Sequence, residues 1–346
     1  MPSKLHTAVL RGTKEGDKTY GFDDQRTLRE PVTYFFQESH EGVILFIVFR
    51  TPPCRHSKCT FCPLPQTGTL RPVSFWHYGE QIEAVFRDPM VKARLHEIRK
   101  VIVSNQGSIL DEETFPTLAL IHFVYLCQRD IRGFICLSLE TRPEYVDRLE
   151  LDALFRAMCE VDHRISIELA IGYEAHDDHV RNGLLKKGLI LEGRGPHTLE
   201  SLARKCAERE FRLKCYFMLK PWPTFTDETA VEDVKRGIDF LNALGNEYGG
   251  KISMHLNPTF VGKGTALVTP FERGEFVPPR LVDVARAALH AEGKQVPIFL
   301  GLNDEGLAVP GGSFLRRGDE PVVELLERFN RTQDFELLHA VVRRAT

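Results

Sequence analysis

The stretch Val43–Cys62, with the sequence VILFIVFRTPPCRHSKCTFC, decides the fold of this chain. Its first seven residues are all apolar and are rich in β-branched and aromatic side chains. A run of this length and composition predicts a fully buried strand over Val43–Phe49. The loop that follows holds three of the eight cysteines, Cys54, Cys59 and Cys62. The sequence therefore predicts a buried strand with three thiols just beyond its carboxyl end.

The rest of the chain continues this pattern, because short apolar runs alternate with amphipathic stretches. We expect further strands at residues 101–103, 134–139, 165–171, 213–219, 252–256 and 296–300. We expect helices at 78–97, with an interruption near Pro89, and at 112–127, 145–158, 197–210, 227–244 and 281–291. The alternation predicts an α/β fold of parallel βα units. Polar segments such as SNQGS, ETRPE, KPWP and NPT follow the strand ends, which favours a partial (β/α)6-type TIM barrel.

The sequence shows no internal repeat and no low-complexity linker that would separate two domains. We expect residues 1–42 to form an N-terminal extension and residues 43–265 a core barrel. Residues 266–346 are expected to form a C-terminal elaboration that packs on the barrel. With 346 residues, 42% of them hydrophobic, and 23 Phe, the chain can bury a sizeable core, which excludes disorder as its main state.

Composition also limits the location and the partners. No apolar run approaches the roughly 20 residues that a bilayer-spanning helix needs, and the N-terminus shows no secretory signal. We therefore expect a cytoplasmic protein without a membrane partner. The formal charge is −3, from 45 Lys and Arg against 48 Asp and Glu, whereas chains that bind RNA over a wide face usually carry a basic excess.

The spacing C-x4-C-x2-C leaves three kinds of site open. A structural zinc site would need a fourth ligand, which His56 or His77 could supply. A plant-type [2Fe–2S] cluster uses the same spacing but needs a fourth Cys, and the next is Cys127, within a predicted helix. A [4Fe–4S] cluster with three thiolates would leave one iron open for a chelating molecule. The five scattered cysteines are expected to be buried small hydrophobic residues: Cys127, Cys136, Cys159, Cys206 and Cys215.

Four further blocks of sequence narrow these possibilities. They are ETRPEY (Glu140–Tyr145), IELAIGYE (Ile167–Glu174) followed by RNGLLKKG, LKCYFMLKPWPT, and NPTFVGKGTAL. Together with the cysteine loop they resemble the radical SAM superfamily, in its Elongator catalytic-subunit-like branch. Within that branch they are most similar to the radical SAM subunit of archaeosine synthase, a tRNA-modifying C–N lyase. The usual superfamily spacing has three residues and then two, whereas this chain has four and then two. The acetyltransferase domain of the Elongator subunit and a separate RNA-binding domain have no counterpart in the sequence.

The resemblance implies an enzyme with a [4Fe–4S] cluster on Cys54, Cys59 and Cys62, whose open iron binds S-adenosylmethionine (SAM). Reductive cleavage of SAM would give a 5′-deoxyadenosyl radical that abstracts hydrogen from the substrate. The implied substrate is a modified nucleobase in tRNA, presented with the help of a partner protein. The implied electron donor is a protein such as flavodoxin or ferredoxin. A small metabolite as substrate, and a zinc-stabilised binding protein without this chemistry, are the alternatives.

The resemblance also implies a set of SAM contacts, which lie at or near the strand ends. They are Phe61, Ser104, Gln106, Gly107, Ser108, Glu140, Arg142, Glu168 and the backbone at Leu219. Each side chain also has a structural interpretation: Phe61 could pack the loop, Arg142 could form a salt bridge at the rim, and Glu168 could pair with a buried Arg or Lys.

The sequence identifies no catalytic residue with comparable strength. Weak candidates are Lys220, Asn257 and Cys215, although packing is the simpler interpretation for a cysteine inside a strand. Other residues that could face a substrate are Trp222, Lys263 and Asn303.

Overall fold

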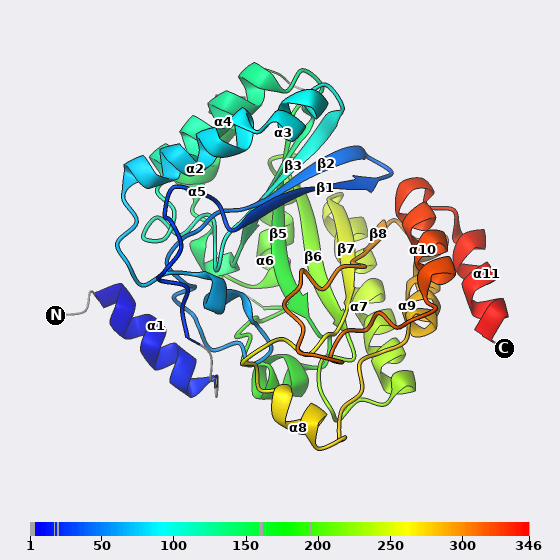
Figure 1. Cartoon of the computed structure of the whole chain (residues 1–346). Helices are drawn as coiled ribbons and strands as arrows, with labels where there is room; N and C mark the ends of the chain where they lie inside the picture. Colours follow the sequence, from blue (N-terminus) through cyan, green and yellow to red (C-terminus); the bar gives the residue numbers. More distant parts are fainter. Residues whose placement is uncertain are drawn as a thin grey trace. The chain divides into compact units, whose positions relative to one another are not determined.

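The computed structural model describes residues 4–16, 18, 21–158, 162, 164–193 and 195–345. The chain divides into two compact units, each of which is described by itself (Figure 1). Unit 1 consists of Met1–Gly12, Gly21–Ser57 and Leu64–Ile171, and unit 2 of Thr13–Tyr20, Lys58–Pro63 and Gly172–Thr346. In the described residues, no helix combines the length and the apolar character that crossing a membrane requires.

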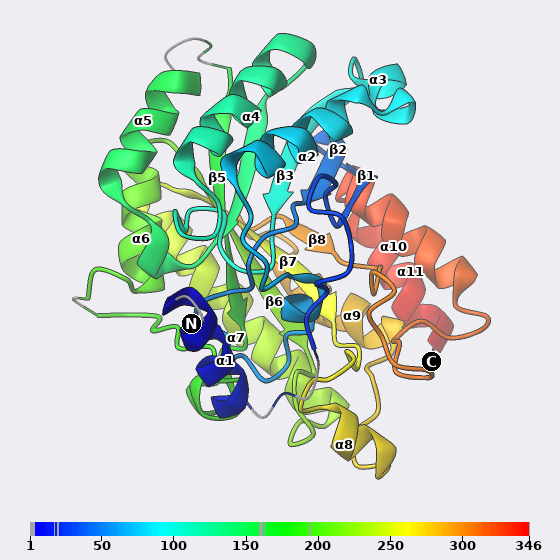
Figure 2. The same cartoon turned by 60° about the vertical axis from the view of Figure 1, so that its left-hand side comes forward.

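Unit 1 is a mostly parallel sheet with helices on one face. Strand β1 (Thr33–Ser39) is antiparallel to β2 (Gly42–Val48), and the order continues through parallel pairs. These further strands are β3 (Ile98–Ser104), β4 (Cys136–Thr141) and β5 (Ser166–Glu174), whose last three residues belong to unit 2. Its main helices, which lie side by side in Figure 2, are α2 (Phe75–Arg87), α4 (Thr117–Asp130) and α5 (Arg148–Met158). The short elements are η1 (Leu64–Thr67), α3 (Pro89–Arg94) and η2 (Pro143–Tyr145), and α1 (Lys4–Glu15) begins in this unit.

Unit 2 continues the same alternation. Its strands β6 (Arg212–Leu219), β7 (Lys251–Pro258) and β8 (Ile298–Leu300) are parallel and neighbour each other in chain order. Its helical elements are the π-helix η3 (His179–Leu184), α6 (Leu199–Ala207), α7 (Asp227–Tyr248), α8 (Val268–Glu272), α9 (Leu281–Ala288), η4 (Leu289–Ala291), α10 (Glu320–Thr332) and α11 (Phe335–Ala345). The predicted fold class is therefore confirmed: an α/β chain with the sequential parallel strands of a partial (β/α) barrel.

The strands owe their two faces to the period-2 alternation of side chains. On β6, Leu213, Cys215, Phe217 and Leu219 are fully buried on one face, which packs against α6 and α7. The opposite face of the sheet carries polar residues within an otherwise apolar strand, such as Lys214 on β6. The same holds in unit 1, where Lys100, Ser138 and Glu168 are buried on neighbouring strands β3, β4 and β5.

Two predicted elements differ from the structure. The helix expected over 78–97 is two helices, because the carboxylate of Asp88 accepts hydrogen bonds from Met90 N (2.7 Å) and Val91 N (3.2 Å) and so starts α3. Pro89 occupies the first turn of that helix, where its missing N–H costs nothing. Strand β1 lies within the expected N-terminal extension and was not predicted.

Glu150 in the first turn of α5 has an unusual environment. Burial raises the pKa of Glu150 to about 7 from 4.5, and the neighbouring carboxylates Glu112 and Asp147 add to the rise against a hydrogen bond from Thr117. The folded state therefore binds this proton more tightly than the unfolded chain does. Its contribution to the free energy of unfolding is present at low pH and is lost as the pH rises from about 4.5 through about 7.

We therefore expect Glu150→Gln to unfold with a free energy about 1–2 kcal/mol higher than the wild type at pH 8, after allowance for solvent screening. At pH 4 the two proteins should be equally stable. Urea denaturation at both pH values measures the difference, and a difference that does not change with pH would contradict the raised pKa.

Candidate functional site

The first cysteine is held in unit 1 by the segment that follows β3. Gln106 Oε1 accepts hydrogen bonds from Thr51 N (2.8 Å) and Thr51 Oγ1 (3.1 Å), and Gln106 Nε2 donates to Phe49 O (3.1 Å). The backbone carbonyl of Gln106 accepts from Cys54 N (3.2 Å). Gln106 therefore uses both ends of its amide to fix the start of the cysteine loop.

Gly107 lies against the same cysteine. A Cβ atom at this position would be 2.7 Å from Cys54 Cα and 2.9 Å from Cys54 Cβ, closer than atoms can pack. The glycine is therefore required for the backbones of the two segments to approach each other. The sequence predicted a close approach at Gly107, and the structure gives Cys54 as its neighbour.

Arg55 connects the loop to the residues after β3, an interaction that the sequence did not suggest. Its guanidinium donates to both carboxylate oxygens of Asp111, at 2.7 and 2.6 Å, and forms an ion pair with Glu113 at 2.9 Å. The same group lies over the Tyr145 ring, 5.1 Å from its centroid. Although burial works to raise the pKa of Asp111, two charge-assisted hydrogen bonds of this geometry hold the carboxylate in place.

The other predicted contacts of unit 1 lie at the ends of β3 and β4. Ser104 Oγ donates a hydrogen bond to Glu140, and the hydroxyls of Ser108 and Thr141 bond to each other. Arg142 is buried and pairs with Glu144 through Nε. Burial works to raise the pKa of Glu144, but the Arg142 guanidinium holds it below its ordinary value. Arg142 therefore forms the salt bridge that was one of its two interpretations.

Glu168 has a lysine partner in the same unit. Glu168 Oε2 is 2.8 Å from Lys100 Nζ, and Oε1 accepts a hydrogen bond from Ser138 Oγ at 2.7 Å. Lys100 also pairs with Glu41 at 2.8 Å. Burial would lower the pKa of Lys100, yet Glu168 beside it raises the pKa above its ordinary value. The structural interpretation of Glu168, a buried carboxylate with a cationic partner, therefore describes these contacts.

The second half of the cysteine loop is held in unit 2 by the residues that follow the π-helix. Thr60 Oγ1 donates to Leu184 O (2.9 Å), and Thr60 N donates to Leu185 O (3.1 Å). Cys59 Sγ lies 4.0 Å from the carbonyl oxygen of Lys186. Isolated π-helical turns are rare and occur frequently at functional sites. Here the turn places two carbonyl groups where the loop's Thr60 can use them.

Phe61 is packed by apolar side chains of unit 2. It lies against a buried cluster formed by Ala175, Val180 and Leu185, to which Trp222 also contributes. The packing interpretation of Phe61 therefore applies to this structure. The substrate-side candidate Trp222 belongs to the same cluster.

A buried ion pair at the end of β5 was missed by the sequence reasoning. Glu174 Oε1 and Lys187 Nζ are 2.8 Å apart, and both side chains are largely buried. Glu174 has a left-handed backbone with φ of 71°. A Cβ atom on Gly172 would lie 2.0 Å from Glu174 Oε1 and 2.1 Å from Lys187 Nζ, so the pair fits only above a glycine. The glycine in IELAIGYE is the sequence signal that could have identified it.

The weak catalytic candidates have different surroundings in unit 2. Lys220 follows β6 with φ of 59° and pairs with Asp227 at 2.7 Å. Asn257 lies near the backbone of Gly301, because a Cβ there would be 2.0 Å from Asn257 Oδ1. Cys215 is fully buried on the helix-facing side of β6. Of the remaining positions, Leu219 O accepts from Thr259 N (3.2 Å), Lys263 N donates to Leu307 O (3.1 Å), and Asn303 Oδ1 accepts from Glu305 N (2.8 Å).

The cysteines separate into two groups. Cys54 and Cys62 are partly exposed and Cys59 is near the buried limit, whereas Cys127, Cys136, Cys206 and Cys215 are buried, as predicted. Burial raises the pKa of Cys206 to about 12, so this thiol stays protonated. Cys159 lies outside the described residues. Within the described ranges, no three His, Cys, Asp or Glu side chains are gathered as a metal site. The thiolate ligand set therefore stays a prediction from the spacing and the chemistry of the donors.

Comparison with known proteins gives two structural similarities. No family model matches the sequence, and no curated protein matches it. Elp3 of the archaeon Methanocaldococcus infernus, solved with its N-terminus deleted, has 15% identity and a TM-score of 0.46, over 73% of this chain and 58% of its own. SuiB of Streptococcus suis has 12% identity and a TM-score of 0.39, over 70% of this chain and 46% of its own. The chain thus spans about half the length of these two proteins.

We expect Gly107→Ala to lower the free energy of unfolding by about 1–3 kcal/mol, because the added methyl group meets the Cys54 backbone, which cannot move independently. The matched control is Gly79→Ala in α2, where a Cβ would meet nothing within 4 Å. That change should stabilise the protein by about 0.5–1 kcal/mol. Urea denaturation of both variants decides the point, and equal effects would remove the close approach from the argument.

Proposed function

We propose that this chain is a radical SAM enzyme that binds a [4Fe–4S] cluster through Cys54, Cys59 and Cys62. The observation that carries the proposal is the position of the cysteine loop, which begins directly beyond the carboxyl end of the parallel strand β2. Both halves of the loop are anchored by hydrogen bonds, the first to Gln106 and the second to Leu184 and Leu185. Three thiols with no fourth Cys nearby suit a cluster that keeps one iron open. When bound, such a cluster and SAM supply an electron and a sulfonium, whose reductive cleavage yields a radical that removes hydrogen.

The chain offers polar groups of both signs for the amino-acid and ribose parts of SAM. In unit 1, the half-buried carboxylate of Glu140 can accept from an ammonium group, with Ser104 fixing its orientation. In unit 2, Lys187 and Glu174 provide one donor and one acceptor that are already desolvated. A desolvated ion pair is well suited to bind a polar ligand, because much of the cost of removing water from the two side chains is met during folding.

The proposed substrate is a modified nucleobase in tRNA, by resemblance to archaeosine synthase, with a partner protein that presents the RNA. The formal charge of −3 favours the second candidate, a small metabolite that needs no phosphate-binding face. A cytoplasmic location and an electron donor such as flavodoxin or ferredoxin complete the proposal.

We expect anaerobic reconstitution to load about four irons and four sulfides per chain. SAM and dithionite should then give deoxyadenosine. Cys59→Ala should abolish iron binding while the circular dichroism spectrum stays unchanged. The matched control is Cys206→Ala, which removes a buried thiol of unit 2 and should keep its iron. Stoichiometric zinc without deoxyadenosine would replace the enzyme with the zinc-stabilised binding protein.

Salt dependence separates the two substrate classes. Binding to tRNA through several phosphates should weaken with salt, with a slope of about 0.7–0.9 in log K against log salt for each phosphate. Fluorescence anisotropy with labelled tRNA measures this slope. Negligible binding at low salt, with or without added partner proteins, would instead favour the small metabolite.

A further inference from the structure

Three consecutive helices of unit 1 expose large apolar side chains in their first turns. Trp76 on α2, Leu118 on α4 and Leu149 on α5 are 77%, 67% and 78% exposed. Neighbouring helices of the unit pack in the order α2, α4, α5, and each begins at the carboxyl-end rim of its strand (Figure 2). These three side chains therefore lie at one rim of unit 1.

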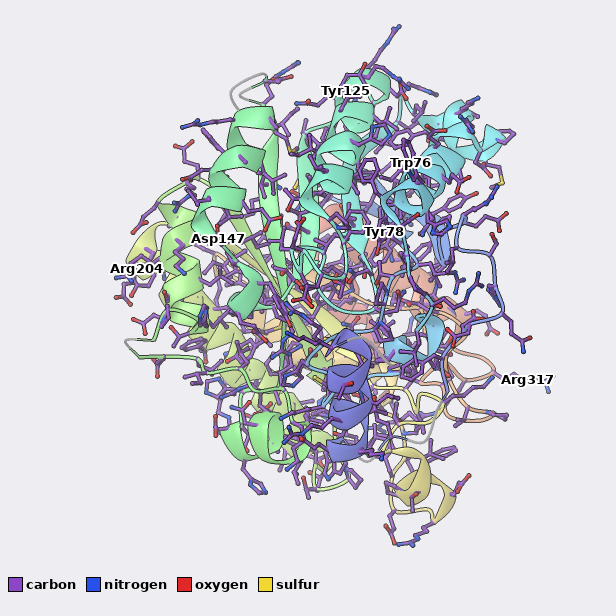
Figure 3. All side chains as sticks on the ribbon, turned by 90° about the vertical axis from the view of Figure 1, so that its left-hand side faces the viewer. Trp76, Tyr78, Tyr125, Asp147, Arg204 and Arg317 are labelled. Atoms are coloured by element: carbon purple, nitrogen blue, oxygen red, sulfur yellow. The ribbon has the colours of Figure 1, made fainter. Side chains whose placement is uncertain are left out.

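The apolar surface continues along the same helices. Ile121 and Tyr125 follow Leu118 at three- and seven-residue steps, and so share its face of α4. Phe75 packs edge-on against Trp76, with ring centroids 5.8 Å apart. Figure 3 shows Trp76 and Tyr125 on this side of the unit. We call these six residues and the acidic group described next the rim patch. Exposed contiguous apolar surface of this kind, rich in aromatic residues, is typical of protein interfaces.

Three carboxylates lie between the two leucines. Thr117 Oγ1 donates both to Glu112 and to Glu150 Oε1 (2.9 Å), which brings these two acids together at the start of α4. Asp147 accepts from Leu149 N at 2.8 Å and faces the first turn of α5. None of Glu112, Asp147 and Glu150 forms an ion pair with a residue that the structure describes. The nearby cation on α4, Arg129, is already paired with Asp130.

The rim patch is continuous with the cysteine loop inside unit 1. Asp111 and Glu113, on either side of Glu112, both bind the guanidinium of Arg55, the residue next to Cys54. A molecule that covers Glu112 therefore contacts the segment to which the first half of the cysteine loop is anchored.

We propose that the rim patch is the docking surface for a partner protein whose contacting face carries Lys or Arg beside apolar side chains. The uncompensated negative charge is what selects this partner. Phosphates of RNA and of anionic lipids would be repelled by the three carboxylates. A second copy in a two-fold arrangement would bring the same acids against each other. Basic side chains would pair with them while apolar groups cover Trp76 and the leucines.

The test uses the full chain and two synthetic amphipathic helices, one of Lys and Leu and the other of Glu and Leu. We expect the Lys/Leu peptide to bind at least tenfold more tightly than the Glu/Leu peptide and to shift the Trp76 emission to the blue. The chain has two Trp, so the measurement is made in a Trp222→Phe background. The double variant Leu118→Gln, Leu149→Gln should weaken Lys/Leu binding at least tenfold. Met90→Gln, which changes an equally exposed apolar residue on α3, should change it less than twofold.

Charge is tested in the same way. Glu112→Gln with Glu150→Gln should weaken Lys/Leu binding at least fivefold and reduce its salt dependence, whereas the exposed control pair Glu272→Gln, Glu275→Gln should not. Binding that is unaffected by the Leu118 and Leu149 changes would overturn the proposal. A dimer that these two changes convert to a monomer, or displacement of the peptide by tRNA, would overturn it in favour of a second copy or of RNA. None of these measurements needs the cluster, so they succeed or fail independently of the radical chemistry.

Discussion

The side-chain amides of two glutamines hold the chain where it leaves the central strand β2, and the rest of the candidate site depends on them. Backbone groups beyond a strand end lose their sheet partners, and each one that stays buried without a partner costs free energy. Gln81 satisfies Arg50 by accepting from its N–H (2.7 Å) and donating to its carbonyl (3.0 Å). Gln106 does the same for Phe49 and Thr51. The chain can therefore turn into the cysteine loop while still buried.

The sequence predicted the fold well because one rule governs most of it. Parallel strands buried on both faces are continuous apolar runs, so Val43–Phe49 and its counterparts could be identified individually. Strand β1 was missed because it is an edge strand whose residues are mostly half-exposed, and it carries no such run. The division of the 78–97 helix depended on a single cap, Asp88, whose role is clear only from its hydrogen bonds.

The candidate site was predicted less completely, for a physical reason. Motif spacing indicates which residues gather at a rim, but not which of them become partners of each other. Glu168 and Arg142 were expected near a ligand and are paired with Lys100 and Glu144. Arg55 and Asp111 lie far apart in the sequence without a shared pattern, so their bidentate pair could not be foreseen. The thiols themselves were recognisable from their spacing alone.

Two successive strands end on residues that are poorly suited to their backbone. Glu174 after β5 and Lys220 after β6 both have left-handed φ values, which disfavour any residue with a side chain by about 1–2 kcal/mol relative to glycine. Glycine would fit either place without strain. Keeping a carboxylate and an ammonium there instead sacrifices thermodynamic robustness for chemistry. A lineage selected only for heat resistance would be expected to lose these two charged groups early.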